Sequence, residues 1–430
     1  MFKNESGCVG PARVSRRADI RAGLLSSCSI TARIAPQGPD NSPTRRAAIA
    51  ILRPVGIRSG AAALQALTVV DEVLDGRATV LPVPADDAEQ TSLLTTALRA
   101  GQKIDDDIAV VLSTSGTTGT PKGALLTVSA LVASARATHH RLGGDGRWLL
   151  ALPAYHVAGF QVLVRSVVTG TEPVAIPATF DGAELVSAVA ALGPGRRYAS
   201  LVAAQLDKAL GDPGAAEALA DLDAVLIGGG PMPAAVAEKA SAAGISVVRT
   251  YGMSETAGGC VYDGVPLDGV GVSVADDGRI SLGGPTIASG YRNPVTPDPF
   301  AEPGWFRTDD IGAVDDSGVL TVLGRVDDAI STGGLTVLPA LVEAALASHP
   351  AVAECAVFGV ADERLGQRVV AAVVAAPGAT ITLPELRSHV AGSLPSTAAP
   401  RQLHVVDALP RRGIGKVDRR ELARVYASTS

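Results

Sequence analysis

The chain has 430 residues, of which 47% are hydrophobic and 19% are charged, a balance typical of a globular protein with large cores and with length for two or more domains. A net charge of −6 argues against a nucleic-acid partner, and no apolar run reaches the length of a membrane span. The four cysteines, Cys8, Cys28, Cys260 and Cys355, show neither a CxxC pair nor a zinc-site spacing, which favours a reduced, cytoplasmic setting.

The first 46 residues are basic and rich in small side chains, with scattered proline and glycine and no hydrophobic periodicity. We expect a disordered or non-native N-terminal extension in this segment. A transit peptide and a misassigned start codon are the alternatives. The argument about the fold therefore begins at residue 47.

Residues 47–324 alternate between apolar runs that resemble strands and alanine-rich runs that resemble helices. We expect strands at 108–112, 148–152, 224–227 and 246–248, and helices at 183–192 and 234–243. This order predicts a large, layered α/β domain with a parallel sheet. Short apolar runs separated by Gly, Asp and Pro predict a β-rich subdomain at about 265–323.

A domain boundary is expected at residues 325–328, because the pattern restarts there. Helix-like runs at 339–347 and 384–394 flank strand-like runs at 352–360 and 368–375. Residues 329–430 therefore form a small α+β domain in this interpretation, of a typical domain size.

A loop dense in glycine, hydroxyl groups and lysine follows the first of these strands, from Ser113 to Gly123. Backbone N–H groups, hydroxyls and an ammonium group together suit the binding of phosphate oxygens. The loop is not a Walker A motif, because Pro121 stands where the second glycine would be. A polar surface turn is the alternative. The candidate phosphate ligands are Ser115, Gly116, Thr117, Thr118, Gly119 and Lys122.

Two further polar motifs follow predicted strands. Gly229 and Gly230 lie in a triple-glycine turn that would let a flat ligand approach the backbone. An ordinary strand-to-helix turn is an equally good interpretation of these glycines. In the segment 250–256, Tyr251 beside Gly252 is suited to stack on a base, Ser254 to donate to a phosphate, and Glu255 to hold Mg²⁺. The alternative is a helix N-terminus capped by Ser254.

Three other features carry chemistry. The pair Asp309-Asp310 is suited to bond ribose hydroxyls, or else forms a solvated turn. Lys416 lies in a basic, glycine-punctuated segment that we read as an ordered loop with a point charge, rather than a floppy tail. His156 follows a strand and begins an apolar helix, so it is either a structural histidine or part of a ligand pocket.

In this order the motifs resemble those of the adenylate-forming superfamily, which includes acyl-CoA synthetases, peptide-synthetase adenylation domains and luciferases. The resemblance covers about residues 105–425. It is strongest to the short actinobacterial ligases that join 2-succinylbenzoate to CoA in menaquinone biosynthesis, because the region before the phosphate loop is short and residues 198–206 resemble their substrate strand. Another aryl- or fatty-acyl-CoA ligase, or a non-catalytic nucleotide-binding relative, is the alternative.

The resemblance implies a large N-terminal domain, a small mobile C-terminal domain, and a two-step reaction in which a carboxylic acid and ATP form an acyl-AMP that CoA then attacks. For the nucleotide it implies the following roles: Ser115, Gly116, Thr117, Thr118 and Lys122 hold phosphates; Gly229 and Tyr251 contact adenine; Asp310 and Arg325 bind ribose; Ser254 binds the α-phosphate; Glu255 holds Mg²⁺; and Gly119, Gly230 and Gly252 also line the nucleotide site. It further implies His156 and Ser200 for the acyl group and Asp327 as the hinge. Lys416 is implied as the cation that bridges the carboxylate and the phosphate.

Three departures from the superfamily pattern stand out. Asp309 replaces the usual glycine, which leaves open whether Asp309 or Asp310 binds ribose. Ser331 replaces a lysine after the hinge, and Ala203-Ala204 replace bulkier residues of the substrate strand. The oligomeric state stays open, with a homodimer as one candidate.

Overall fold

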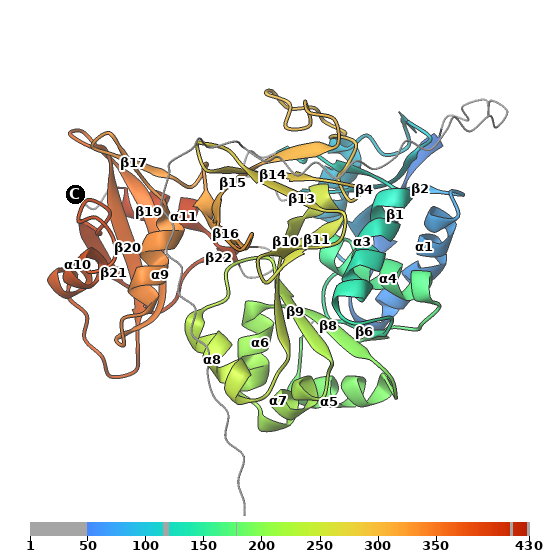
Figure 1. The fold of residues 1–430 in the computed structure, drawn as a ribbon, viewed down its shortest axis with the longest axis horizontal. Helices are drawn as coiled ribbons and strands as arrows, with labels where there is room; N and C mark the ends of the chain where they lie inside the picture. The colour runs from blue at the N-terminus through green and yellow to red at the C-terminus, as the bar shows by residue number, and fades with distance from the viewer. Residues whose placement is uncertain (1–49, 115–119, 178, 413–415, 428–430) are drawn as a thin grey trace, which may run out of the picture. The chain divides into compact units, whose positions relative to one another are not determined.

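The computed structural model describes residues 50–114, 120–177, 179–412 and 416–427 (Figure 1). The predicted extension at 1–46 and the loop residues 115–119 lie outside the described residues. In the described part of the chain, no helix is long and apolar enough to cross a membrane.

The first sheet has five strands in the order β3-β1-β2-β4-β5. Its central strands β1, β2 and β4 are parallel, and β3 and β5 are antiparallel at the two edges. The strands are β1 (Ala50–Ile57), β2 (Thr79–Pro84), β3 (Lys103–Ile104), β4 (Ile108–Leu112) and β5 (Ala124–Thr127), and the helices beside them are α1 (Leu67–Leu74) and α2 (Ala88–Ala97), with a 3-10 turn η1 (Gly60–Ala66).

The second sheet has seven strands in the order β12-β11-β10-β9-β8-β6-β7. The neighbouring strands β10, β9, β8, β6 and β7 are parallel to one another, and β11 and β12 are added antiparallel at one edge. The strands are β6 (Arg147–Leu150), β7 (Val174–Ala175), β8 (Arg197–Val202), β9 (Ala224–Gly228), β10 (Val247–Met253), β11 (Gly258–Tyr262) and β12 (Val265–Pro266), and the helices are α3 (Val128–Arg141), α4 (Val157–Thr169), α5 (Gly182–Ala191), α6 (Ala203–Leu210), α7 (Pro213–Ala220) and α8 (Ala234–Ala242).

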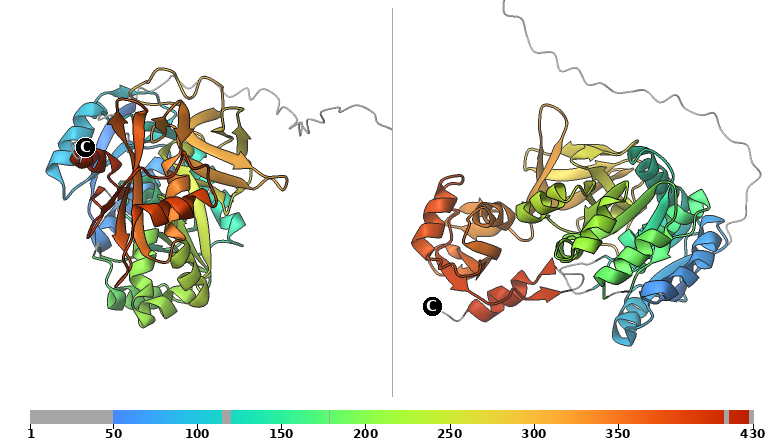
Figure 2. Two further views of the ribbon diagram at one scale, coloured as in Figure 1. Left: turned by 90° about the vertical axis from the view of Figure 1, so that its left-hand side faces the viewer. Right: turned by 90° about the horizontal axis from the view of Figure 1, so that it is seen from below.

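Alternate residues of the second sheet pack into different cores, because successive side chains of a strand point to opposite faces. Trp148, Tyr198 and Leu226 pack on the side of α3 and α4, whereas Ala199 and Val225 pack on the side of α5 to α8. The core beneath Trp148 also reaches the first sheet, whose other face is covered by α2. The result is five layers, α-β-α-β-α, which Figure 2 shows from two further sides.

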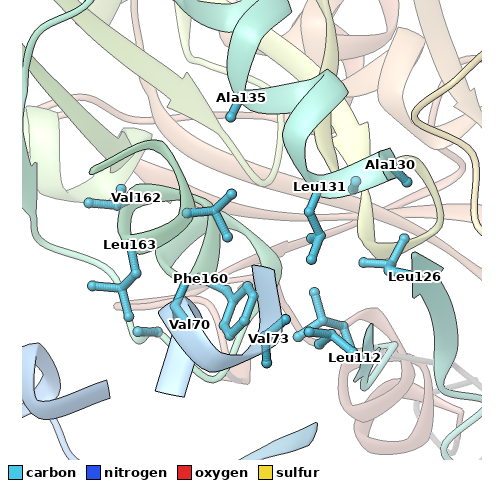
Figure 3. Packing of buried hydrophobic residues seen from close by; sticks show 14 of the residues in the cluster. Val70, Val73, Leu112, Leu126, Ala130, Leu131, Ala135, Phe160, Val162 and Leu163 are labelled. Carbon is cyan, nitrogen blue, oxygen red and sulfur yellow. The ribbon is translucent and has the colours of Figure 1, made fainter. Parts of the chain in front are cut away.

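The central core lies between the two sheets and consists mainly of aliphatic side chains, with Phe160, Trp148, Tyr198 and Tyr262 as its fully buried aromatic residues; Figure 3 shows part of it. Phe160 of α4, Leu131 of α3 and Val73 of α1 meet there above Leu112 of β4, and each is at most 1% exposed. Burying one such side chain stabilises the fold by about 1.5–3 kcal/mol. This core fixes β4, which leads directly into the segment predicted to bind phosphates.

Two smaller sheets follow. The β-rich subdomain has the order β13-β14-β15-β16, with β13 (Gly271–Val274), β14 (Arg279–Gly283), β15 (Trp305–Val314) and β16 (Leu320–Arg325). The C-terminal sheet contains β17 (Ile330–Thr332), β18 (Leu335–Val337), β19 (Val352–Asp362), β20 (Gly366–Ala375) and β21 (Gln402–Val405). One of its faces packs on α9 (Pro339–Ala347) and α10 (Leu383–Ala391), and the other on α11 (Arg419–Tyr426). A short hairpin, β22 (Arg411–Arg412) with β23 (Lys416–Val417), precedes α11.

The predicted α/β architecture with a β-rich subdomain and a small α+β C-terminal domain is confirmed. The predicted strand at 108–112 and the predicted helix at 339–347 coincide with β4 and α9. The prediction for β10 is wrong at its end. The strand was expected to stop by residue 249, where polar residues begin, but it continues to Met253 because Tyr251 pairs with Val261 of β11.

Candidate active site

One edge of the second sheet collects several of the residues that the sequence singled out. The parallel strands β8, β9 and β10 lie side by side (Figure 1), so their carboxyl ends share this edge. Ser200 lies beside Leu226, Val202 beside Gly228, and Arg249 beside Ile227. In open α/β sheets this is the edge at which ligands bind.

Glycines let the backbone pass closely at this edge. A Cβ on Gly228 would lie 2.6 Å from Thr250 Oγ1, and a Cβ on Gly252 would lie 2.1 Å from the carbonyl oxygen of Gly258. Gly229 has a φ of +82°, which disfavours side chains. Gly230 has nothing within 4 Å of a hypothetical Cβ, so the turn after β9 presents open backbone.

The chain reverses between β10 and β11 through the 3-10 turn η2 (Ser254–Thr256). The N-cap of this turn is Met253, whose N–H donates to Thr256 Oγ1 at 2.9 Å. The alternative interpretation, in which Ser254 caps a helix, is therefore wrong. Ser254 Oγ instead donates to the carbonyl oxygen of Ser113 at 3.2 Å, which joins this turn to the strand that leads into the phosphate loop.

Tyr251, Asp310 and Arg325 form one hydrogen-bonded group. Tyr251 OH donates to Asp310 Oδ2 at 2.6 Å, and Arg325 Nη1 lies 3.3 Å from Asp310 Oδ1. Burial raises the pKa of the Asp310 carboxyl, although the bond from Tyr251 and the charge of Arg325 oppose the rise. Burial and the neighbouring Asp310 likewise raise the pKa of Tyr251, so its phenol stays protonated and acts as a donor.

Asp309 lies in a different environment from Asp310. Neighbouring residues of β15 point to opposite faces, and Asp309 pairs with Arg279 and lies 3.7 Å from Arg325 Nη2. Its side chain is 46% exposed, against 10% for Asp310. Of these two carboxylates, only that of Asp310 forms a hydrogen bond with Tyr251 among the described residues.

A second group contains Glu255, Tyr291 and Lys122. Tyr291 OH donates to Glu255 Oε1 at 2.6 Å, and Lys122 Nζ lies 5.3 Å from the centroid of the Tyr291 ring. Burial raises the pKa of the Glu255 carboxyl, and the Tyr291 hydrogen bond and the charge of Lys122 act in the opposite direction. The group is thus a buried carboxylate held between a phenol donor and a nearby cation.

The predicted acyl-pocket residues lie on the side of the second sheet that faces α4. Ser200 is 6% exposed and has the same facing as Tyr198, which packs on that side. His156 is the N-cap residue of α4, and its ring lies 4.7 Å from that of Tyr155. The next residue, Val157, lies 3.8 Å from a hypothetical Cβ on Gly258, so the start of α4 adjoins the turn that carries Glu255.

The predicted hinge residue Asp327 forms a bidentate ion pair with Arg325, at 2.8 and 3.0 Å. Burial alone would lower the pKa of Arg325, but Asp327, Asp310 and Asp309 raise it overall. One guanidinium therefore connects the predicted hinge to the predicted ribose ligand.

Not every predicted site residue falls within the description. Ser115, Gly116, Thr117, Thr118 and Gly119 lie outside the described residues. Lys416 is described only through its backbone, which pairs with Arg412 in the hairpin β22–β23.

Sequence reasoning missed Tyr291, which touches both Glu255 and Lys122. It also missed Thr308, whose Oγ1 accepts from the Asp310 N–H at 3.0 Å and donates to the carbonyl oxygen of Ile280 at 2.9 Å. Thr308 lies within the polar motif that contains Asp309 and Asp310, but no role was predicted for it. The signal for Tyr291 was weak, because it stands in a short Gly-Tyr-Arg-Asn-Pro segment that reads as a turn.

A protein-family model described as "AMP-binding enzyme" matches residues 44–292, more than half of the chain. A second model, "AMP-binding enzyme C-terminal domain", matches residues 341–416. The chain belongs to the AMP-binding enzyme family. The two models divide this AMP-binding enzyme in the same order as the two domains expected from its sequence.

Relatives of this AMP-binding enzyme carry a consistent name. It is 63% identical over 382 residues to a "Probable 2-succinylbenzoate--CoA ligase" of Mycobacterium tuberculosis, covering 87% of this chain and 99% of that protein. It is 36% identical over 346 residues to a "2-succinylbenzoate--CoA ligase" of a Geobacillus species, covering 74% of this chain and 69% of that protein.

Solved structures agree on the fold. The o-succinylbenzoate CoA synthetase MenE of Bacillus subtilis, solved with the acyl-adenylate OSB-AMP, superposes with a TM-score of 0.69 at 26% identity over 86% of this chain and 88% of that one. The same enzyme solved with ATP and magnesium gives a TM-score of 0.72 at 25% identity, over 86% and 89%.

Proposed function

We propose that this protein is an AMP-forming acid–thiol ligase that activates 2-succinylbenzoate and transfers it to CoA in menaquinone biosynthesis. The observation that carries the proposal is the 63% identity to a probable 2-succinylbenzoate--CoA ligase over 99% of that protein's length. The grouping of Tyr251 with Asp310 and of Glu255 with Lys122 at one sheet edge supports it.

The first half-reaction joins two anions. A carboxylate oxygen of the acid attacks the α-phosphorus of ATP, the bond from that phosphorus to the bridging oxygen breaks, and pyrophosphate leaves with the electron pair. The attacking group is already ionised, so no general base is needed. Repulsion and alignment limit the step, and these are what fixed donors and cations reduce.

The residues near Tyr251 are suited to hold the nucleoside. Gly229 and Gly230 offer open backbone to adenine, and Tyr251 supplies the adjoining aromatic face. Asp310 is the better candidate for the ribose hydroxyls, because it is the carboxylate bonded to Tyr251 and fixed by Arg325. Asp309 is occupied by Arg279. We therefore propose Asp310, rather than Asp309, as the ribose ligand.

The residues near Glu255 are suited to hold phosphates and Mg²⁺. Burial raises the pKa of the Glu255 carboxyl, and a bound cation beside it would favour its ionised form. Mg²⁺ prefers oxygen ligands and usually shares them with substrate phosphates, so a single protein carboxylate such as Glu255 suits it. Bound there, Mg²⁺ would neutralise phosphate charge. Lys122, Ser254 and the loop residues 115–119 complete the phosphate end.

The second half-reaction needs a different arrangement, since the CoA thiol attacks the acyl carbonyl and AMP leaves. We assign residues 47–324 to the large domain, 325–328 to the hinge and 329–430 to the small domain. Rotation about Asp327 would withdraw Lys416 after adenylation and admit CoA. The ion pair between Arg325 and Asp327 supports a hinge that is linked to the nucleotide site.

The acyl group would lie against Ser200 and the start of α4 at His156, on the face of the second sheet that carries Tyr198. We place the enzyme in the cytoplasm, where ATP and CoA are available.

Pyrophosphate exchange tests the proposal. Labelled pyrophosphate is followed into ATP with 2-succinylbenzoate, benzoate and a fatty acid in separate reactions, and CoA is then added to score the thioester. We expect exchange with 2-succinylbenzoate to exceed that with the other acids by at least tenfold. Preferred exchange with another acid would transfer the assignment to another acyl-CoA ligase, and ATP binding without exchange would leave a nucleotide-binding relative.

A further inference from the structure

The segment from Ser289 to Asn293 runs alongside the strand that leaves the phosphate loop. Leu125 N–H donates to Gly290 O, and Ser289 N–H donates to Leu125 O, both at 2.9 Å. Further along, Arg292 N–H donates to Gly123 O at 2.8 Å and Asn293 N–H to Lys122 O at 2.9 Å. Four backbone hydrogen bonds therefore fix this segment to residues 122–125.

Side chains strengthen the same attachment. Asn293 Nδ2 donates to Pro121 O at 2.8 Å and to Ala97 O at 2.9 Å. Arg292 Nε donates to Leu98 O at 3.3 Å. The segment thus joins the exit of the phosphate loop to the end of α2, which leaves the loop exit little freedom.

Tyr291 is held in the middle of this segment and is 9% exposed. Its ring packs edge-on against Phe300, with centroids 5.1 Å apart. One end of the side chain donates to Glu255 Oε1 at 2.6 Å, while Lys122 lies 5.3 Å from the ring centroid. One side chain therefore lies next to an anion from the turn between β10 and β11 and a cation from the connection between β4 and β5.

A buried tyrosine with one hydrogen bond is usually only a stabilising residue. This one differs in its partners, since Glu255 and Lys122 are the two groups proposed for the metal–phosphate end of ATP. A phenol donor orients the carboxylate without neutralising it, and the ring face favours a nearby ammonium. Correct spacing between the two charges is what a metal-bound phosphate requires.

We infer that Tyr291 is a positioning residue that holds the Glu255 carboxylate and the Lys122 ammonium in register for magnesium-bound ATP. This inference rests on the proposed function. It assigns Tyr291 to the coupling of metal and nucleotide binding, rather than to contact with the substrate. Its signature is therefore a change in how strongly Mg²⁺ enhances ATP binding.

The test is the variant Tyr291→Phe, which keeps the ring against Phe300 and Lys122 and removes only the hydroxyl. ATP binding is measured by calorimetry without the acid, so that no turnover occurs, over a series of Mg²⁺ concentrations and in EDTA. We expect affinity for ATP in saturating Mg²⁺ to fall roughly tenfold, the size expected for a hydrogen bond to a charged group, and affinity in EDTA to change less than twofold. The matched control is Tyr262→Phe, which removes a buried hydroxyl bonded to Thr138 and should leave both affinities unchanged.

The outcomes separate cleanly. Unchanged Mg²⁺ enhancement in Tyr291→Phe, or an equal loss with and without Mg²⁺, overturns the inference. A melting curve for each variant identifies any general loss of folding. A double-mutant cycle then combines Tyr291→Phe with Lys122→Met. Additive losses in Mg²⁺-dependent ATP affinity would contradict the inference that Tyr291 positions Glu255 and Lys122 together. If the unaltered protein binds no ATP, the proposed function itself fails.

Discussion

The guanidinium of Arg419 connects the start of α11 to helix α9 and to the predicted hinge. It donates to Glu343 of α9 through Nε to Oε1 at 3.1 Å, through Nη2 to Oε1 at 2.9 Å and through Nη2 to Oε2 at 2.7 Å. Its Nη1 lies 3.5 Å from Asp328 Oδ2 in the predicted hinge. We predict that Arg419→Ala loosens α11 and with it the hairpin that carries Lys416.

The expected size follows from the burial of the pair. The Arg419 and Glu343 side chains are 28% and 15% exposed, so the pair lies between a surface ion pair, worth about 0–1 kcal/mol, and a buried pair, whose disruption costs about 3–5 kcal/mol. We expect Arg419→Ala to lower the stability of α11 by about 2 kcal/mol, between these two limits. Glu343 Oε1 also accepts the Val357 N–H at 2.8 Å, so the carboxylate keeps one partner after the substitution.

The assay must report on α11 itself, because both tryptophans, Trp148 and Trp305, lie outside the small domain. Hydrogen–deuterium exchange read by mass spectrometry does so. A loss of about 2 kcal/mol speeds exchange of the α11 amides roughly 30-fold, while peptides from β8 and β9 keep their rates.

A double-mutant cycle with Glu343→Gln isolates the pair, and a coupling of at least about 1 kcal/mol is expected. Arg424→Ala, whose ion pair with Glu421 is exposed, is the control and should leave exchange unchanged. Exchange in Arg419→Ala within twofold of the unaltered protein would refute the reasoning, because the ion pair would then contribute no stability to α11.

Three other predictions follow from the site and the core. Lys416→Ala should abolish acyl-AMP formation but spare thioester formation from supplied acyl-AMP; equal losses in the two half-reactions, measured by quenched flow, would contradict a lysine specific to adenylation. Burial lowers the pKa of His139 from 6.5 to about 4. Between these pH values the unfolded chain therefore binds more protons than the folded protein. The free energy of unfolding should fall as the pH falls, by up to about 3 kcal/mol. Urea titrations of His139→Gln should lack this slope, whereas the exposed His140→Gln should keep it. Gly252→Ala places a Cβ against a carbonyl oxygen of β11 and should lower both the melting temperature and the affinity for ATP. Gly230→Ala is the control, because open space surrounds that position, and it should leave the melting temperature unchanged.

The sequence was most informative where local signals agreed. For α9, Pro339 at the first helical turn and a regular apolar pattern marked both ends correctly, because proline suits the first helical position. For β10, the polar run that begins at Thr250 suggested a loop. The strand continues there because β11 pairs with it, and a pairing with another strand leaves no trace in the local pattern.

The same contrast applies to the site. Glu255 could be proposed from its own motif, since a carboxylate after a strand end is locally visible. Tyr291 could not, because its significance comes from a contact with a residue 36 positions away. Arg419 pairs with a glutamate 76 positions away. Such contacts are created by packing between elements, and a single sequence carries no record of them.

The strict alternation in the second sheet has a consequence for the evolution of this enzyme. Tyr198 and Ser200 face α4, while Ala199 and Leu201 face the opposite helices. Adding or deleting one residue within β8 would exchange these two sets, burying Ser200 among aliphatic side chains and turning leucine toward the proposed acyl pocket. Changes of substrate preference must therefore arise by replacement of side chains within the strand, while changes in chain length are confined to the connections between strands.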